Sequence, residues 1–502
     1  MGDLSCGIGP GRRLFRLAND AIIRQMIAKL RLLILPTDKA IFRRVLVLAF
    51  PVILGNLSRV LMNVVDVAMV GRLGTKALAA VGLGAVLIWT ILSIGISFRT
   101  GVQTVTARRY GQKRFSDCGL ALNTGLVLAG MVGVVLAVVG YKLAGTAIRF
   151  LIDDPAVIPL AIAYTQWSFV GAACITIGYA FQGFYNGVER TRIHMEVTIV
   201  SNLLNIYLDA GLIFGNARLT EMLAASPMGD LSFLSVLWSP FDFPALGVEG
   251  AAIATLCAAV WMIIHYTIRG FTQEFRRNYG AFKGGFNREI LKKEVEIAAP
   301  QGFQEVGVMV VYVLFFKIIG IIGTLEVAAT QVVFTLAMAS FLPAVGFGVA
   351  CATLVGKALG EEDPERAAIS MLESVRWSVV FMGTMGILFL LFPRPILSIF
   401  TNERAVIEMG LLPLRILGVV QFFDAVGLTL WFGLSGAGNT VFPAIIDLSL
   451  SWGIFLPGCY LLGIVFDYGI VGPWLAFALY LFLYAVTITW KILKGDWKEI
   501  KV

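Results

Sequence analysis

The chain has 502 residues, of which 58% are hydrophobic and 14% are charged, and its formal net charge is +8. Soluble domains usually carry about 25% charged residues. This composition, with a mean hydropathy of +0.84, therefore excludes a water-soluble globular protein and indicates that lipid surrounds most of the chain. The positive residues lie between apolar runs, which argues against a nucleic-acid partner. Two histidines and six scattered cysteines suggest no catalytic or structural metal set, so we expect neither an enzyme nor a cofactor.

The chain opens with a basic segment, residues 1–40, which lacks a signal-peptide pattern and should lie in the cytoplasm. Its residues 12–34 are amphipathic, which fits a helix on the membrane surface and equally a disordered tail. Twelve apolar runs follow, each long enough to cross a bilayer core of about 30 Å as a helix. No period-2 alternation typical of membrane strands is visible. The runs lie near residues 41–70, 81–106, 119–145, 157–182, 194–215, 247–268, 295–319, 328–356, 369–392, 405–434, 442–465 and 469–490.

The charges of the connecting segments predict the orientation. With the N-terminus inside, the inside segments contain 28 Lys and Arg residues and the outside segments contain 7. Because Lys and Arg accumulate in cytoplasmic loops, both termini should be cytoplasmic in a multi-pass protein of the cell (plasma or inner) membrane. The inside segments include a basic linker at residues 269–294 and a tail at residues 491–502.

The two halves of the chain form an internal repeat. A shift of 249 residues aligns them without a gap over about sixty positions, and 27 extra residues near 216–243 form an outside-loop insertion in the first half. The matched residues include Pro51 with Pro300, Gly71 with Gly320, Thr104 with Thr353, Gly111 with Gly360, Gly187 with Gly436, and Thr191 with Thr440. Six spans per half imply an axis along the membrane normal. We therefore predict an all-α polytopic membrane protein with twelve transmembrane helices in two pseudo-symmetric six-helix bundles, an N-lobe (41–268) and a C-lobe (295–490), with a cavity between them.

A polar set in the first half is replaced by apolar residues in the second. The pairs are Asp66 with Phe315, Asn205 with Ile454, Asp209 with Gly458, and Thr255 with Phe477. Asn205 and Asp209 are four residues apart on one helix face, which Asn202 extends. Two carboxylates with neutral oxygens can hold Na⁺ or a proton, and acids deep in a span usually serve transport. We interpret the set as a cation-coupling and substrate-binding site, with a static hydrogen-bonded core as the alternative.

The second half has acids of its own. Glu305 lies in the seventh span and Asp424 in the tenth, and both are secondary candidates for a cation site. Asp447 and Asp467 should lie nearer to the ends of spans and matter less.

Several segments resemble motifs of the MATE (multidrug and toxic compound extrusion) family, in the family's order, over about residues 41 to 490. In the first half they are residues 51–84 (PVILGNLSRVLMNVVDVAMVGRLGTKALAAVGLG), 201–215 (SNLLNIYLDAGLIFG) and 247–255 (GVEGAAIAT). In the second half they are residues 343–363 (PAVGFGVACATLVGKALGEED) and 433–440 (GLSGAGNT). The resemblance implies a drug/H⁺ or drug/Na⁺ antiporter with two six-helix lobes.

The resemblance also implies roles for individual residues. Asp66, Asn205 and Asp209, with Thr255, match the N-lobe cation site of the family's DinF-like branch, where Na⁺ or a proton would bind, and Pro51 matches the first-helix proline that bends when the site is protonated. Asp424 matches a C-lobe acid of the NorM-like branch. Glu305 stands about one helical turn earlier than that branch's pattern, so the expected coupling site is in the N-lobe.

The function expected from these observations is efflux of amphiphilic or cationic organic compounds by alternating access, by a protein that works as a monomer. A flippase for lipid-linked oligosaccharides would need several cations around a pyrophosphate, whereas the intramembrane charges here are mostly acidic. An exporter of organic anions is a further alternative. Arg59 and Arg99 lie within spans 1 and 2, where each could pair with an acid, line the cavity, or extend its side chain to an interface.

Overall fold

The structure is a computed structural model that describes residues 37–225 and 230–502. Residues 1–36, and with them the amphipathic part of the basic N-terminal segment, lie outside the described residues. The described part contains twelve helices that are long and apolar enough to cross a membrane, and it contains no strand. The predicted all-α class with twelve transmembrane helices is confirmed.

The first half contains six long helices and two short ones. They are α2 (Lys39–Gly71), α3 (Thr75–Gly111), α4 (Phe115–Leu151), α5 (Ile158–Gly187), α6 (Thr191–Ala224), η1 (Ser232–Leu237), α7 (Val248–Gly270) and η2 (Glu274–Asn278). The second half repeats the order of the six spans, except that the eleventh span of the chain consists of four consecutive short pieces, α13 to η4. The helices are α8 (Arg288–Ile322), α9 (Thr324–Gly360), α10 (Pro364–Leu391), α11 (Pro393–Ser398), α12 (Arg404–Ala437), α13 (Val441–Leu450), η3 (Ser451–Phe455), α14 (Leu456–Tyr460), η4 (Leu461–Val465), α15 (Val471–Lys494) and η5 (Asp496–Glu499).

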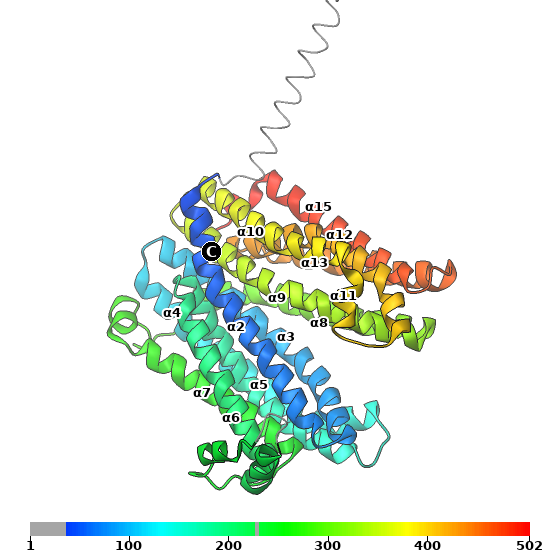
Figure 1. Cartoon of the computed structure of the whole chain (residues 1–502). Coiled ribbons are helices and arrows are strands. Elements are labelled where there is room, and N and C mark those ends of the chain that lie inside the picture. Colours follow the sequence, from blue (N-terminus) through cyan, green and yellow to red (C-terminus); the bar gives the residue numbers. More distant parts are fainter. Residues whose placement is uncertain (1–36, 226–229) are drawn as a thin grey trace, which may run out of the picture.

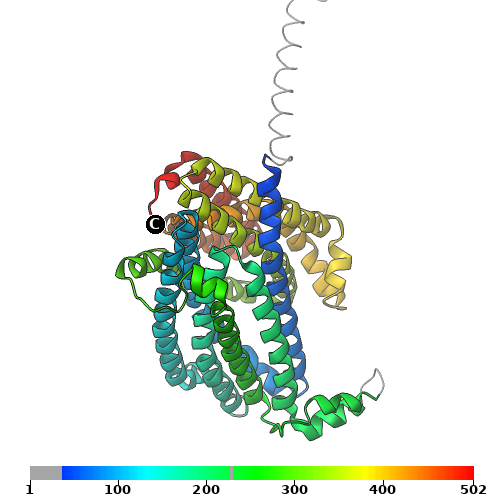
Figure 2. The same cartoon turned by 90° about the vertical axis from the view of Figure 1, so that its left-hand side faces the viewer.

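Most helices extend beyond the apolar runs that predict them, and in α6 most of the extension follows a kink. It continues to Ala224, but Gly215 has φ 70° and ψ 162°, values that are not helical and that glycine adopts without strain. The straight part of α6 therefore ends where the apolar run ends. The residues after this kink belong to the 216–243 insertion, whose described residues lie at the end of the molecule opposite the C-terminus (Figure 2).

Helices α2–α7 form one bundle and α8–α15 form a second, and the two bundles diverge away from the end that holds the C-terminus (Figure 1). The first helix of each bundle makes the same kind of contacts. Helix α2 packs on α6 of its own bundle and on α9 and α10 of the other. Helix α8 packs on α13 and α14 of its own bundle and on α3 and α4 of the other. Spans 1 and 7 are thus equivalent in three dimensions, as the repeat predicts.

Paired hydrogen bonds across the interface obey the same symmetry. Thr104 Oγ1 donates to the carbonyl of Ser435 at 2.9 Å, and Thr353 Oγ1 donates to the carbonyl of Asn186 at 3.1 Å. Both donors and both acceptors are separated by the repeat length of 249 residues. The two halves therefore share these threonines because each one joins its own bundle to the other.

Two repeat-related glycines allow α3 and α9 to touch. A Cβ atom on Gly111 would lie 2.1 Å from the Lys357 carbonyl oxygen, and one on Gly360 would lie 2.2 Å from the Arg108 carbonyl oxygen. Distances this short exclude any side chain at either position, which explains the glycine in both halves. The contact joins the bundles at the ends of these helices nearest the C-terminus (Figure 1).

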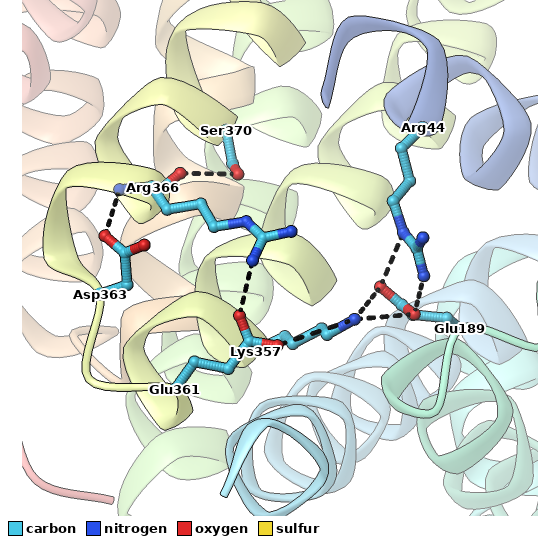
Figure 3. A network of polar contacts seen from close by, with 7 residues as sticks. All are labelled: Arg44, Glu189, Lys357, Glu361, Asp363, Arg366 and Ser370. Atoms are coloured by element: carbon cyan, nitrogen blue, oxygen red, sulfur yellow. Dashed lines mark hydrogen bonds and ion pairs between the residues drawn. The ribbon is translucent and has the colours of Figure 1, made fainter. Parts of the chain in front are cut away.

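Charged side chains join the bundles at the same end of the molecule, which holds Asp38 and Val502 and which we call the termini end. Figure 3 shows Glu189, from the turn between α5 and α6, bound to Arg44 of α2 and to Lys357 of α9. Lys357 Nζ lies 3.2 Å from the Glu189 carboxylate, and Glu361 links Lys357 to Arg366. The Glu189 side chain is only 6% exposed. In this conformation the two bundles are locked together at the termini end.

Candidate cation site in the first bundle

The first bundle holds two acids that touch. Asp66 of α2 is half-buried and Asp209 of α6 is completely buried. Their carboxyl groups are within hydrogen-bonding range of each other. Carboxylates have only acceptor atoms, so such a bond requires a proton on one of them. Two ionised carboxylates at this separation would need a cation between them.

Neutral oxygens complete the surroundings of this carboxyl pair. Asn205 is 1% exposed, and its Nδ2 donates to Thr255 Oγ1 of α7 at 3.5 Å. Within the described part of the chain, Asn205 Oδ1 has no hydrogen-bond donor, and the Asp209 oxygens have none beyond the contact with Asp66. Buried acceptor atoms without donors are costly, and carboxylate and amide oxygens are the ligands that hard cations prefer. The residues present therefore fit either a proton or Na⁺.

The structure separates Asn202 from this set. Asn202 Nδ2 donates to Ser58 Oγ of α2 at 2.9 Å. Its side chain therefore joins α6 to α2 on the termini side of the carboxyl pair. Tyr164 of α5, which the sequence analysis did not select, lies within electrostatic reach of both acids. The repeat contains a signal for it, because the equivalent residue in the second half is Pro413.

Pro51 lies between the carboxyl pair and the termini end. It is buried inside α2, which continues as a helix through this position. Helix α9 approaches α2 closely here, since a Cβ atom on Gly346 would lie 3.2 Å from the Ala49 carbonyl oxygen. Proline removes one hydrogen bond from the helix ladder, so this is the position at which α2 can bend most easily.

The second bundle has a buried acid near the start of the eleventh span. Asp447 lies six residues after the start of the span, and it is only 7% exposed. It accepts hydrogen bonds from Gln304 Nε2 at 2.6 Å and from the Tyr480 hydroxyl. Helix α13 begins at Val441, so Asp447 lies nearly two turns inside the helix, covered by α8 and α15. Glu305 and Asp424 are close enough to Asp447 for the charges of these acids to interact. Asp467, in contrast, is exposed in the loop between η4 and α15.

Twelve apolar helices in two repeat-related bundles, with ionisable groups enclosed in each, define a membrane transporter rather than an enzyme. The MatE family model matches residues 51–210 and 300–461, one block in each half. The chain therefore belongs to the MatE family.

Known proteins resemble the chain over almost its full length. The probable multidrug resistance protein NorM of Thermotoga maritima is 28% identical over 457 residues, which cover 90% of this chain and 92% of that protein. A crystal structure of MATE in the straight conformation superposes with a TM-score of 0.80 at 20% identity, covering 92% of this chain and 97% of the other. An outward-facing multidrug resistance MATE family transporter of the MOP superfamily superposes with a TM-score of 0.79 at 20% identity and the same coverage. These two likenesses concern the fold. The nearer resemblance to the DinF-like branch stays a prediction.

Proposed function

We propose that this protein is a secondary antiporter that exports amphiphilic or cationic organic compounds in exchange for H⁺ or Na⁺. The observation that carries the proposal is the contact between the Asp66 and Asp209 carboxyl groups, next to a buried Asn205 oxygen without a donor. Such a site binds a cation reversibly, which an antiporter requires. The family and the multidrug resistance name of the Thermotoga relative support the substrate class.

The arrangement of α2 suggests how cation binding is coupled to export. A proton or Na⁺ between the acids holds α2 against α6, and its loss lets the two carboxylates repel each other. Helix α2 also contacts α9 and α10, so a movement around Pro51 changes the interface between the bundles. Coupling requires that substrate and cation stabilise different arrangements of the bundles. Alternating access then consists of closing one end of the interface while the other opens.

The orientation is part of the same proposal. The termini end faces the cytoplasm of a cell in whose plasma or inner membrane the protein lies, and the 216–243 insertion lies outside. Charge asymmetry between the connecting segments supports this orientation. The protein works as a monomer on small organic substrates, because the carboxyl pair lies within one bundle of a single chain.

The test uses purified protein in liposomes that contain a fluorescent cationic dye. An imposed H⁺ or Na⁺ gradient should drive the dye against its own concentration gradient, and collapse of both gradients should stop this movement. Empty liposomes carrying the same gradients give the background. Dye transport that continues unchanged after both gradients have been collapsed contradicts coupling.

An organic-anion exporter is a second candidate, and one observation favours it. Arg59 and Arg99 form no ion pair in the described part of the chain, although both lie inside membrane spans. The flippase alternative has less support, because a pyrophosphate would need more cations than these two.

A further inference from the structure

Two arginines within the first bundle have no hydrogen-bond or ion-pair partner among the residues that the structure describes. Arg99 of α3 is only 9% exposed, and its Nε atom is enclosed without an acceptor. Arg59 of α2 is half-buried. Among the described residues, neither guanidinium makes a hydrogen bond or an ion pair. A buried guanidinium without an acceptor is costly in a protein and more costly in a membrane.

The two arginines lie close together, on the termini side of the carboxyl pair. They are within electrostatic reach of each other, and both are within reach of His194. Arg59 and Asp66 are seven residues apart, so they share one face of α2 with about 10 Å between their positions along the helix axis. His194 does not offset the positive charge of the arginines, because an imidazole ring is either neutral or positive. Its two ring nitrogens are already hydrogen-bonded, Nδ1 to the Tyr266 hydroxyl at 2.6 Å and Nε2 to Gln182 Nε2 at 2.9 Å.

One acid faces this pair from the other bundle. Glu305 of α8 is within electrostatic reach of Arg99 but forms no ion pair with it within 4.0 Å. One carboxylate at a distance leaves the two guanidiniums with a net positive charge. Arg99 lies seven residues, or about 10 Å along the helix axis, before the end of the apolar run at residue 106, and its side chain is buried within the protein, so it is not placed at the membrane surface.

The arginines are also specific to one half. At the repeat positions the second half has Val308 in place of Arg59 and Gly348 in place of Arg99. A role in holding the shared scaffold would be expected in both halves. The difference resembles that at Asp66, where the second half has Phe315, and it indicates a ligand-binding role.

We propose that Arg59 and Arg99 bind an anionic group of the transported substrate. A guanidinium pair presents planar forks of N–H donors, which suit a carboxylate, sulfonate or phosphate. The inference rests on the proposed export function and refines its substrate class. The preferred substrates are amphiphiles that carry an acidic group near their cationic part, rather than compounds that carry only positive charge.

The test compares two dyes that differ by one ester. Rhodamine 110 has a free carboxylate, and rhodamine 123 is its methyl ester with the same cationic ring system. Binding of each dye to the purified full chain is measured by fluorescence anisotropy for wild type, Arg59→Gln, Arg99→Gln and the control Arg72→Gln, whose side chain is exposed in a turn between α2 and α3. A charge-assisted hydrogen bond contributes about 1.5–3 kcal/mol, so each of the first two variants should weaken rhodamine 110 relative to rhodamine 123 about tenfold or more.

The ratio of the dissociation constants for the two dyes distinguishes loss of the anion contact from a general disturbance of the fold. A variant that only disturbs the fold weakens both dyes equally, and the half-buried Arg59 provides a second test if Arg99→Gln does not fold. An unchanged ratio in both arginine variants overturns the anion site. If the wild type then still moves rhodamine 123 under an imposed gradient, the proposed export function stands without this refinement. If it moves neither dye, the export proposal itself fails.

Discussion

Asp447 and Asp66 show how far a single residue can be interpreted from sequence. The repeat singles out Asp66, because the second half has Phe315 at the equivalent position. Asp447 lies near the end of an apolar run, a position that does not reveal that α8 and α15 cover it. The repeat criterion would have selected it, since the first half has Thr198 there. Burial depends on neighbouring helices, which a one-dimensional pattern does not contain.

Replacement of Asp447 should destabilise the second bundle. Asp447→Asn keeps the shape but offers one acceptor oxygen where the carboxylate accepts from both Gln304 and Tyr480. We expect a loss of about 1–3 kcal/mol, the cost of a buried polar group without a partner. The measurement is the midpoint of thermal unfolding in detergent. Asp467→Asn is the matched control because it is exposed at φ 56°, a conformation that asparagine tolerates. Equal midpoints for the two variants would contradict the assignment.

At the scale of elements, the sequence predicts the spans well and their ends less well. The apolar run at 81–106 lies within α3, which continues to Gly111 because its last turn packs against α9 rather than against lipid. The eleventh span appears as one run, yet it contains π-helical turns at η3 and η4. Such turns depend on local packing and leave no mark in hydropathy.

The segment after α15, residues 495–502, contacts both bundles. Trp497 is completely buried in the second bundle, and its Nε1 donates to the carbonyl of Ile492 at 3.0 Å. Arg108 of the first bundle donates to the carbonyl of Ile500 at 2.6 Å. A hydrogen bond from Lys491 lowers the pKa of Asp496, so the stabilisation from this contact is present at neutral pH and is lost as the pH falls below about 4.

Loss of the buried tryptophan should weaken the attachment of this C-terminal segment to the bundles. Trp497→Ala is expected to cost about 3–5 kcal/mol, as for other large residues removed from a core. The variant should unfold at a lower temperature and be cleaved faster by protease at its C-terminal tail. Trp490→Ala removes a tryptophan that is 57% exposed on α15 and should change little. If both variants behave like the wild type, residues 496–502 do not hold the bundles together.

At the scale of the whole molecule, the repeat predicts two equivalent bundles but not which end of the interface is closed. Thr104 and Thr353 make equivalent hydrogen bonds across the termini end, and only the three-dimensional structure shows that this end is locked by Glu189 (Figure 3). Alternative packings of one sequence can differ by only a few kcal/mol. A sequence pattern common to both packings cannot choose between them.

The carboxyl pair within the first bundle is the central claim, and four acid-to-amide variants test it most directly. Asp66→Asn, Asp209→Asn, Glu305→Gln and Asp424→Asn are compared with the wild type for gradient-driven dye export in liposomes, at equal protein content. Asp66→Asn and Asp209→Asn should abolish coupled export, since each removes one ionisable partner of the pair. Folding should be preserved, because a neutral amide is cheaper to bury in a membrane than a carboxylate. The second-bundle variants should retain more activity. Normal export by Asp66→Asn together with inactive Asp424→Asn would place the coupling site in the second bundle and contradict this account.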